Sequence, residues 1–224
     1  MTEPVLVVGA TGLVGNLLAR KLVADGRDDH LHLLMRKPVE TAYGAATMHI
    51  APTKKWPDII ASIKAQRVVS CLGSTMKKAG SKEAFAAIDR DLVGVVGKAA
   101  KAAGARQFIT ISSTMANAEA SGFYLKVKGQ AEQLLRELAF DRLDIIRPGL
   151  LRGERPGEAR LGESLAIIAS PLLDRLLHGG LRRFRSIDAR EVAAAIAVLL
   201  VEENSGAHIF ENEAIWKLAE RETL

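Results

Sequence analysis

Cysteine, proline and aromatic residues are scarce in this chain, and no long apolar run is present. One cysteine among 224 residues excludes a disulfide framework, and seven prolines exclude a collagen-like chain. No stretch approaches about 18 consecutive apolar residues, so we expect no membrane span. No basic region precedes a longer apolar core at the start of the sequence, so we expect no secretory signal and a reduced, cytoplasmic setting.

The composition is typical of a folded protein with a basic surface. The chain is 48% hydrophobic and 25% charged and carries a net charge of +5, which favours anionic partners. Its ten aromatic residues are few for a base-stacking platform, and its basic residues are scattered apart from Arg182, Arg183 and Arg185. We therefore expect no nucleic-acid binding and favour a phosphorylated small molecule.

Short β-branched runs alternate with longer stretches rich in alanine and leucine. We predict strands at residues 5–8, 31–35, 47–50, 67–72, 107–112, 143–147 and 207–210. We predict helices at residues 15–25, 58–64, 82–103, 124–138, 161–177, 188–201 and 213–219. The alternation predicts a Rossmann-like, doubly wound α/β fold with a mostly parallel sheet and helices on both faces. Residues 1–224 should form one domain, with residues 152–185 as a small C-terminal substrate or lid segment.

A glycine-rich loop separates the first predicted strand from the first predicted helix. Its three glycines are spaced G-x-x-G-x-x-G, which suits a tight turn and a close approach of backbone to pyrophosphate. The N-terminus of the following helix presents free N–H groups to such an anion. The predicted cofactor-binding residues of this loop are Gly9, Ala10, Thr11, Gly12, Leu13, Val14 and Gly15.

Two cations follow the second predicted strand, where an acidic residue would select NAD(H). Arg36 and Lys37 lie about 20 residues beyond Gly15, at the position expected to meet the adenosine ribose. An arginine there can hold a 2′-phosphate with two parallel hydrogen bonds. We therefore predict NADP(H) in preference to NAD(H).

Tyr124 and Lys128 are four residues apart on a predicted helix and so share one face. A lysine ammonium next to a phenol favours the phenolate, so the pair can exchange a proton with a substrate oxygen. Ser112, Ser113 and Thr114 lie at the carboxyl end of a predicted strand, where open α/β sheets bind ligands. A hydroxyl from this group can hold the same oxygen.

These motifs resemble the short-chain dehydrogenase/reductase superfamily: GATGLVG near the N-terminus, ISS before YLKVK, and RPG after the next strand. Within it, the chain resembles the atypical Tat-interacting oxidoreductase-like proteins along nearly its whole length. The resemblance implies that Ser113, Tyr124 and Lys128 are catalytic, with Tyr124 and Lys128 also meeting the cofactor. It further implies that the cofactor passes along a set of residues beyond the later strands: Cys71, Leu72, Gly73, Pro148 and Leu150. Many members have an asparagine where Asp91 stands here, which departs from the usual proton relay.

The sequence therefore predicts an NADP(H)-dependent oxidoreductase that acts on a carbonyl or alcohol substrate of unknown identity. Two alternatives remain open: an NADP(H)-sensing regulatory or scaffold protein with little turnover, and a sugar-nucleotide-type epimerase. The five histidines show no metal-ligand spacing, so we predict no metal site. We expect Cys71 to be an inert packing thiol. A protein partner or a homodimer through the long helices is compatible with the sequence.

Overall fold

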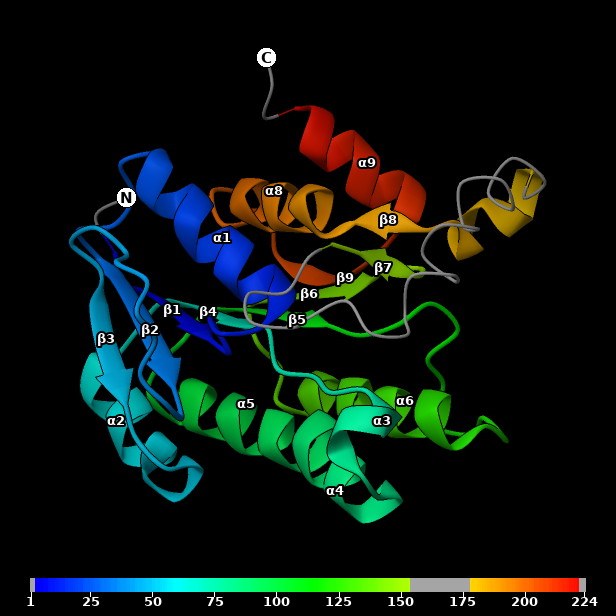
Figure 1. The fold of residues 1–224 in the computed structure, drawn as a ribbon, viewed down its shortest axis with the longest axis horizontal. Helices are drawn as coiled ribbons and strands as arrows, with labels where there is room; N and C mark the ends of the chain where they lie inside the picture. The colour runs from blue at the N-terminus through cyan, green and yellow to red at the C-terminus, as the bar shows by residue number, and fades with distance from the viewer. Residues whose placement is uncertain (1–2, 154–177, 222–224) are drawn as a thin grey trace.

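The computed structural model describes residues 3–153 and 178–221, and these residues form a parallel sheet with helices on both faces (Figure 1). The seven strands lie in the order β3-β2-β1-β4-β5-β6-β9, and every pair of neighbours is parallel. They are β1 (Val5–Val8), β2 (Leu31–Met35), β3 (Thr47–Ile50), β4 (Arg67–Ser70), β5 (Gln107–Ile111), β6 (Arg142–Arg147) and β9 (Gly206–Glu211). The predicted Rossmann-like fold class is confirmed.

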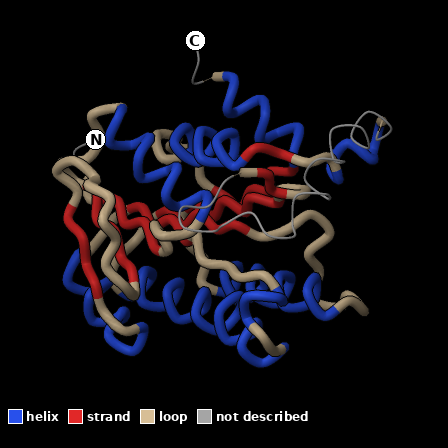
Figure 2. Tube along the Cα trace, viewed as in Figure 1, coloured by secondary structure: helices blue, strands red, loops and turns tan. Residues whose placement is uncertain are grey.

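The helices form a layer on each side of the sheet (Figure 2). One layer contains α1 (Leu13–Ala24), α8 (Ala189–Leu199) and α9 (Asn212–Glu220). The other contains α2 (Trp56–Ile63), α5 (Val93–Ala102) and α6 (Phe123–Glu137), with the short α3 (Met76–Ala79) and α4 (Lys82–Ala86) at its edge. Three further turns are η1 (Thr53–Lys55), η2 (Ala87–Leu92) and η3 (Gly179–Phe184). No helix within the described ranges is long and apolar enough to cross a bilayer.

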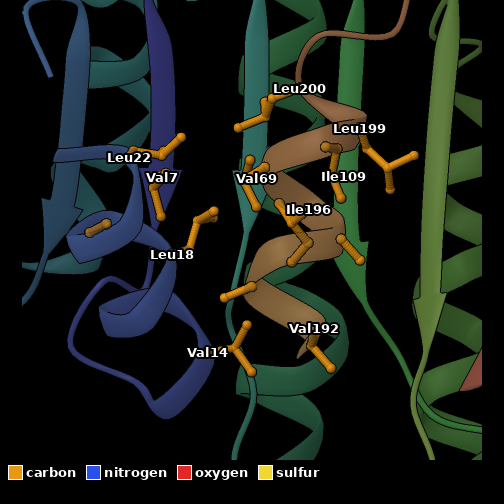
Figure 3. Packing of buried hydrophobic residues seen from close by; sticks show 14 of the residues in the cluster. Val7, Val14, Leu18, Leu22, Val69, Ile109, Val192, Ile196, Leu199 and Leu200 are labelled. Atoms are coloured by element: carbon orange, nitrogen blue, oxygen red, sulfur yellow. The ribbon is translucent and has the colours of Figure 1, made fainter. Parts of the chain in front are cut away.

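The five inner strands, β2, β1, β4, β5 and β6, supply side chains to two hydrophobic cores. Val7 of β1 packs towards α1 and α8, whereas its neighbours Leu6 and Val8 pack towards α2, α5 and α6. Figure 3 shows the first core, where Leu18 of α1 and Ile196 of α8 meet the sheet. Burial on both faces explains why these strands are nearly continuous apolar runs in the sequence.

The strand order reverses between β1 and β4. From β1 the chain moves outward to β2 and β3, and then returns to place β4 on the other side of β1. In open α/β sheets, ligands bind beyond the carboxyl ends of the strands at such a point. The loops that follow β1, β4, β5 and β6 all lie at this edge, because the strands are parallel.

Several predicted elements differ from the observed ones. The helix predicted at residues 82–103 is present but is not a regular α-helix, because α4 continues into a π-helical turn, η2, before α5 begins. A small second sheet pairs β7 (Leu151–Arg152) with β8 (Ile187–Asp188), and neither strand is predicted from so short a stretch. The helix predicted at residues 161–177, and most of the predicted segment 152–185, lie outside the described residues.

Candidate active site

The glycine-rich loop is held in a conformation that requires glycine. Gly9 has φ +86°, and a Cβ atom there would lie 3.0 Å from the carbonyl carbon and oxygen of Cys71. A Cβ atom on Gly15 would lie well under 3.0 Å from the carbonyl oxygen of Gly9. The N–H of Gly12 donates to that same oxygen at 3.0 Å, which closes the turn. Two of the three glycines are thus required by close backbone approach.

The N-terminus of α1 is open to an anion. The helix begins at Leu13, two residues earlier than predicted, with neither a side-chain cap nor an acidic residue in its first turn. The N–H of Asn16 is the first to bond within the helix, at 2.9 Å from the oxygen of Gly12, so the amides before it have no acceptor in the helix. The side chains of Ala10 and Val14 are buried in the core, so these two residues face a ligand only through their backbone. The loop fits the pyrophosphate of a dinucleotide.

Tyr43 and Asn16 support this loop, although the sequence gives no sign of it. The side-chain amide of Asn16 donates to the Tyr43 hydroxyl at 2.7 Å, and that hydroxyl donates to the Ala10 oxygen at 3.4 Å. Both side chains are buried. The segment after β2 is thereby fastened to the loop after β1, through two residues 27 positions apart.

Arg36 and Lys37 follow Met35, the last residue of β2, and both are exposed. Within residues 3–153 and 178–221, no acidic side chain pairs with either of them. Their positive charges are therefore available to an anionic group at this corner of the sheet.

The loop after β4 passes close to the glycine-rich loop. The N–H of Cys71 donates to the oxygen of Val8 at 2.8 Å, while Leu72 packs partly into the core and Gly73 is exposed. Burial raises the pKa of the Cys71 thiol to about 12. The thiol therefore stays protonated at neutral pH, in agreement with the predicted inert role.

Tyr124, Lys128 and Glu132 are spaced four residues apart along α6 and share one face of the helix. Tyr124 is 37% exposed, and its ring lies 5.4 Å from the ring of Phe85. Lys128 and Glu132 are buried. The sequence predicted the first two of these residues but not the third, because a glutamate on a helix is usually a solvated surface residue.

Lys128 is paired with a carboxylate that the sequence did not indicate. Its ammonium nitrogen lies 2.8 Å from Asp89 Oδ1 and 3.3 Å from the oxygen of Ile111. The expected counterpart of the relay asparagine, Asp91, is exposed and pairs with Arg90 at 2.7 Å. The expectation for Asp91 is therefore wrong, because both aspartates lie in the π-helical turn η2, whose wider turn changes which side chain faces the sheet.

Glu132 fastens the ends of two strands to α6. Its carboxylate accepts the Ser112 hydroxyl at 2.6 Å and two N–H groups of Arg147, at 2.8 and 2.5 Å. These hydrogen bonds are the main reason that the pKa of Arg147 is raised. Arg147 also donates to the oxygen of Ala116 at 3.0 Å, so the loop after β5 is held from both sides.

Ser113 directly follows Ser112, whose hydroxyl is bonded to Glu132. It is half-buried, and its backbone oxygen accepts the N–H of Ala116 at 3.1 Å. Ser113, Tyr124 and Lys128 thus lie at the same edge of the sheet, but the described structure shows no hydrogen bond between their side chains. Ser112 is occupied by its bond to Glu132, whereas the hydroxyl of Thr114 is buried and has no partner among the described residues.

Pro148 and Leu150 lie in the loop after β6. Pro148 is buried and its oxygen accepts the N–H of Thr114 at 3.1 Å, whereas Leu150 is 53% exposed. Between them, the N–H of Gly149 donates to the side chain of Asn212 at 2.8 Å. Asn212 is fully buried and also donates to the oxygen of Arg185 at 2.6 Å. It therefore clamps this loop to the segment that enters β8, a link that the sequence does not reveal.

Comparison with known proteins agrees with this geometry. A family profile described as NAD(P)H-binding matches residues 9–201. This chain belongs to that NAD(P)H-binding family. Protein FMP52, mitochondrial, of Candida albicans is 33% identical over 197 residues, covering 85% of this chain and 86% of the relative. Protein HTATIP2 of Rattus norvegicus is 34% identical over 168 residues, covering 73% and 69%. The predicted place among atypical short-chain dehydrogenase/reductases is confirmed.

Solved structures share the fold at low sequence identity. WbmH of Bordetella bronchiseptica, in complex with NAD+, has a TM-score of 0.70 and 15% identity, covering 97% of this chain and 79% of that one. UDP-glucose 4-epimerase of Thermotoga maritima, with UDP-glucose, has a TM-score of 0.69 and 14% identity, covering 97% and 82%. At these identities the likeness supports the fold alone.

The comparisons overturn the expected cytoplasmic setting. The FMP52 relatives of Candida albicans, Debaryomyces hansenii and Emericella nidulans are mitochondrial by name. The expectation relied on a missing secretory signal and an unpaired cysteine, and neither of these excludes an organelle that keeps thiols reduced.

Two other features stand apart from the site. In the part of the chain that the structure describes, no three His, Cys, Asp or Glu side chains are arranged to hold a metal ion. A groove of about 590 Å³ runs between the outer faces of α5 and α6, lined by residues such as Val95, Lys98 and Leu134. The homodimer through these helices stays a prediction.

Proposed function

We propose that this protein is an NADP(H)-dependent oxidoreductase that interconverts a carbonyl compound and its alcohol. The observation that carries the proposal is the position of Tyr124, exposed at the carboxyl edge of the sheet one helical turn from the buried ammonium of Lys128. This edge also contains the glycine-rich loop, so an acid–base group and a dinucleotide site lie together. We take residues 1–224 as one working domain, with residues 152–185 as its substrate segment.

The glycine-rich loop supports the binding of the dinucleotide. Gly9, Gly12 and Gly15 leave room for the pyrophosphate, whose charge the free amides of α1 would meet, together with Thr11 and Leu13. Cys71, Leu72 and Gly73 would lie along the ribose, and Pro148 and Leu150 along the nicotinamide. When bound, the nicotinamide exchanges a hydride with the substrate carbon.

The preference for NADP(H) rests on Arg36 and Lys37. Both are exposed, and no described carboxylate neutralises them. A 2′-phosphate at the end of β2 would meet two positive charges, whereas NAD(H) presents only a hydroxyl there.

Arg36→Ala should weaken NADPH binding by about 10–100-fold, because a hydrogen bond to a charged group contributes about 1.5–3 kcal/mol. NADH binding should change little. Fluorescence titration of both nucleotides measures the two dissociation constants, with Arg20→Ala on α1 as a control for the loss of an exposed arginine. Equal losses for NADPH and NADH would contradict the preference.

In the reaction, Tyr124 exchanges a proton with the substrate oxygen while the hydroxyl of Ser113 holds that oxygen in place. Lys128 is held by Asp89 and by the oxygen of Ile111, so its charge has a defined position beside Tyr124. Glu132 and Arg147 keep the loop that carries Ser113 against α6. These residues together order the acid–base group and its oxygen site before substrate binds.

The side chains exposed around the site support an uncharged substrate. Met76 follows β4, Met115 follows β5 and Leu150 follows β6, and they are 37%, 49% and 53% exposed. An apolar carbonyl compound is matched by such surroundings. An epimerase remains the second candidate, since solved epimerases share the fold.

The decisive experiment follows NADPH oxidation against a panel of aldehydes, ketones and quinones. Wild type should consume NADPH, and Tyr124→Phe should lose at least about 100-fold in rate, the usual contribution of a positioned acid–base group. Lys126→Ala is the control on α6, since Lys126 is exposed and Lys128 is buried. Equal rates in wild type and Tyr124→Phe would refute the mechanism. NADPH binding without consumption, together with conversion of a sugar nucleotide to its epimer, would favour the epimerase.

A further inference from the structure

Asp89 is a buried carboxylate that lies beside the proposed acid–base group. Its side chain is 0% exposed and belongs to the π-helical turn η2. One carboxylate oxygen lies 2.8 Å from the Lys128 ammonium, and the other accepts the backbone N–H of Ser74 at 2.8 Å. Asp89 therefore joins three segments: η2, α6 and the loop that follows β4.

The ion pair of Asp89 and Lys128 lies against that loop. A Cβ atom on Gly73 would lie 3.4 Å from Asp89 Oδ1 and 3.6 Å from the Lys128 nitrogen. The Lys128 side chain is only 6% exposed. An ammonium so far from water is stable in its charged form only beside a counter-ion, and Asp89 is the carboxylate in contact with it.

Lys126 and Glu137 of α6 and Glu83 of α4 are exposed to solvent. Other charged groups of the surrounding elements have neighbours of their own. They are Glu132 of α6 with Arg147 of β6 and Arg136, Arg90 with Asp91 in η2, and Lys82 of α4 over the ring of Phe123. The Asp89–Lys128 pair is neutral as a whole, so its field at Tyr124, one helical turn away, is weaker than that of a lone ammonium. A weaker positive field stabilises the phenolate less.

We infer that Asp89 is a positioning residue that anchors Lys128 and opposes its positive field at the Tyr124 hydroxyl. This inference rests on the proposed function for its chemistry. A protonated Tyr124 donates to a carbonyl oxygen and regains its proton from solvent, to which it is 37% exposed. A site that stabilises the phenolate less suits carbonyl reduction, because alcohol oxidation needs the phenolate at the outset.

The test is an ultraviolet titration of tyrosinate, which needs neither cofactor nor substrate. The chain has two tyrosines, so subtracting the titration of the matching Tyr124→Phe protein isolates Tyr124 from Tyr43. Asp89→Asn should move the Tyr124 midpoint down by about one pH unit, the lower end of the effect of a charge at close range. Asp91→Asn is the matched control and should leave the midpoint unchanged, since Asp91 is exposed and pairs with Arg90. Asp89→Glu keeps a carboxylate at this position, so the Tyr124 midpoint should stay at its wild-type value.

A second comparison remains available if Asp89→Asn does not fold. Lys128→Met leaves Asp89 without its counter-ion, and the double variant Asp89→Asn/Lys128→Met removes both charges. Under the inference, the Tyr124 midpoint lies at least about one pH unit higher in Lys128→Met than in the double variant. Identical midpoints in this pair, or in wild type and folded Asp89→Asn, would overturn the inference. Such a result leaves the assay of Tyr124→Phe against NADPH unaffected, so failure of the inference is distinct from failure of the proposed function.

Discussion

Gly15 faces the carbonyl oxygen of Gly9 so closely that no side chain fits between them. A Cβ atom on Gly15 would lie well under 3.0 Å from that oxygen and 3.0 Å from the Cα atom of Ala10. Both obstacles are backbone atoms, which cannot rotate away as the end of a side chain can. The start of α1 and the end of β1 therefore approach each other only because residue 15 is glycine.

Gly15→Ala should separate α1 from the loop after β1. We expect the free energy of unfolding to fall by about 1–3 kcal/mol, the usual effect of overpacking. NADPH binding should weaken by at least about tenfold, since each 1.4 kcal/mol is a factor of about ten. Thermal unfolding and NADPH fluorescence measure the two effects. Gly122→Ala is the control for unfolding, because a Cβ atom at Gly122 meets nothing within 4 Å.

Glu132 should contribute far more to stability than the exposed arginine that it contacts. Glu132→Ala leaves the partly buried Arg147 without its carboxylate, and breaking such a pair costs about 3–5 kcal/mol. Arg136→Ala removes a side chain that is 39% exposed, so we expect a loss of only about 0–1 kcal/mol. Urea denaturation of both variants gives the comparison. Similar losses would mean that the Glu132 network does not hold β5 and β6.

Asn212→Ala should loosen the loop that carries Pro148 and Leu150. The change leaves the N–H of Gly149 and the oxygen of Arg185 without their bond, and a buried unsatisfied group costs about 1–3 kcal/mol. Hydrogen exchange should then quicken at Gly149. Asn117→Ala is the matched control, because Asn117 is exposed and, among the described residues, its side chain accepts the N–H of Glu119. Unchanged exchange at Gly149 would exclude the clamp.

His32 and His49 should make the folded state less stable at mildly acidic pH. Their ring nitrogens lie 3.1 Å apart across β2 and β3, and the pKa of His32 is lowered by burial and by the charges of His49 and His30. Burial also lowers the pKa of His49. The unfolded chain therefore binds more protons than the folded one below about pH 6.5, so the stabilising contribution is complete above that pH and is lost as the pH falls.

His49→Gln should reduce this pH dependence. Urea denaturation between about pH 5 and pH 7 gives the slope of stability against pH, which should be smaller in the variant than in wild type. His208→Gln, at the opposite edge of the sheet, should leave the slope unchanged. A steeper slope in His49→Gln would show that the pair stabilises its protonated form instead.

The sheet and the glycine-rich loop follow from local sequence, and the structure confirms them. Val5–Val8 and Leu31–Met35 are buried strands as predicted. A strand buried on both faces is a nearly continuous apolar run, so it can be predicted from its own residues alone. Asp89 could not be identified in the same way. The prediction treated residues 82–103 as one regular helix, and the π-helical turn shifts the facing residue from Asp91 to Asp89.

Glu132 and Asn212 lay beyond prediction for a different reason. Each acts through partners that come close only after folding: Ser112 and Arg147 for Glu132, and Gly149, 63 residues away, for Asn212. Helical spacing does place Glu132 on the face of Tyr124 and Lys128, but a shared face does not tell a buried carboxylate from a solvated one. The role of Tyr124 remains a prediction.

The two-stranded sheet of β7 and β8 has a consequence for how this fold tolerates change. Leu151 pairs with Ile187 and Arg152 with Asp188, so two segments far apart in the sequence are held side by side. Once two ends are held together, the entropy of closing the intervening chain grows slowly, by about 0.6 kcal/mol for each doubling of length. Between these strands the chain can be shortened, lengthened or exchanged for another insert at little cost to the Rossmann-like core. The proposed substrate segment, residues 152–185, can then vary in length while the nucleotide site is preserved.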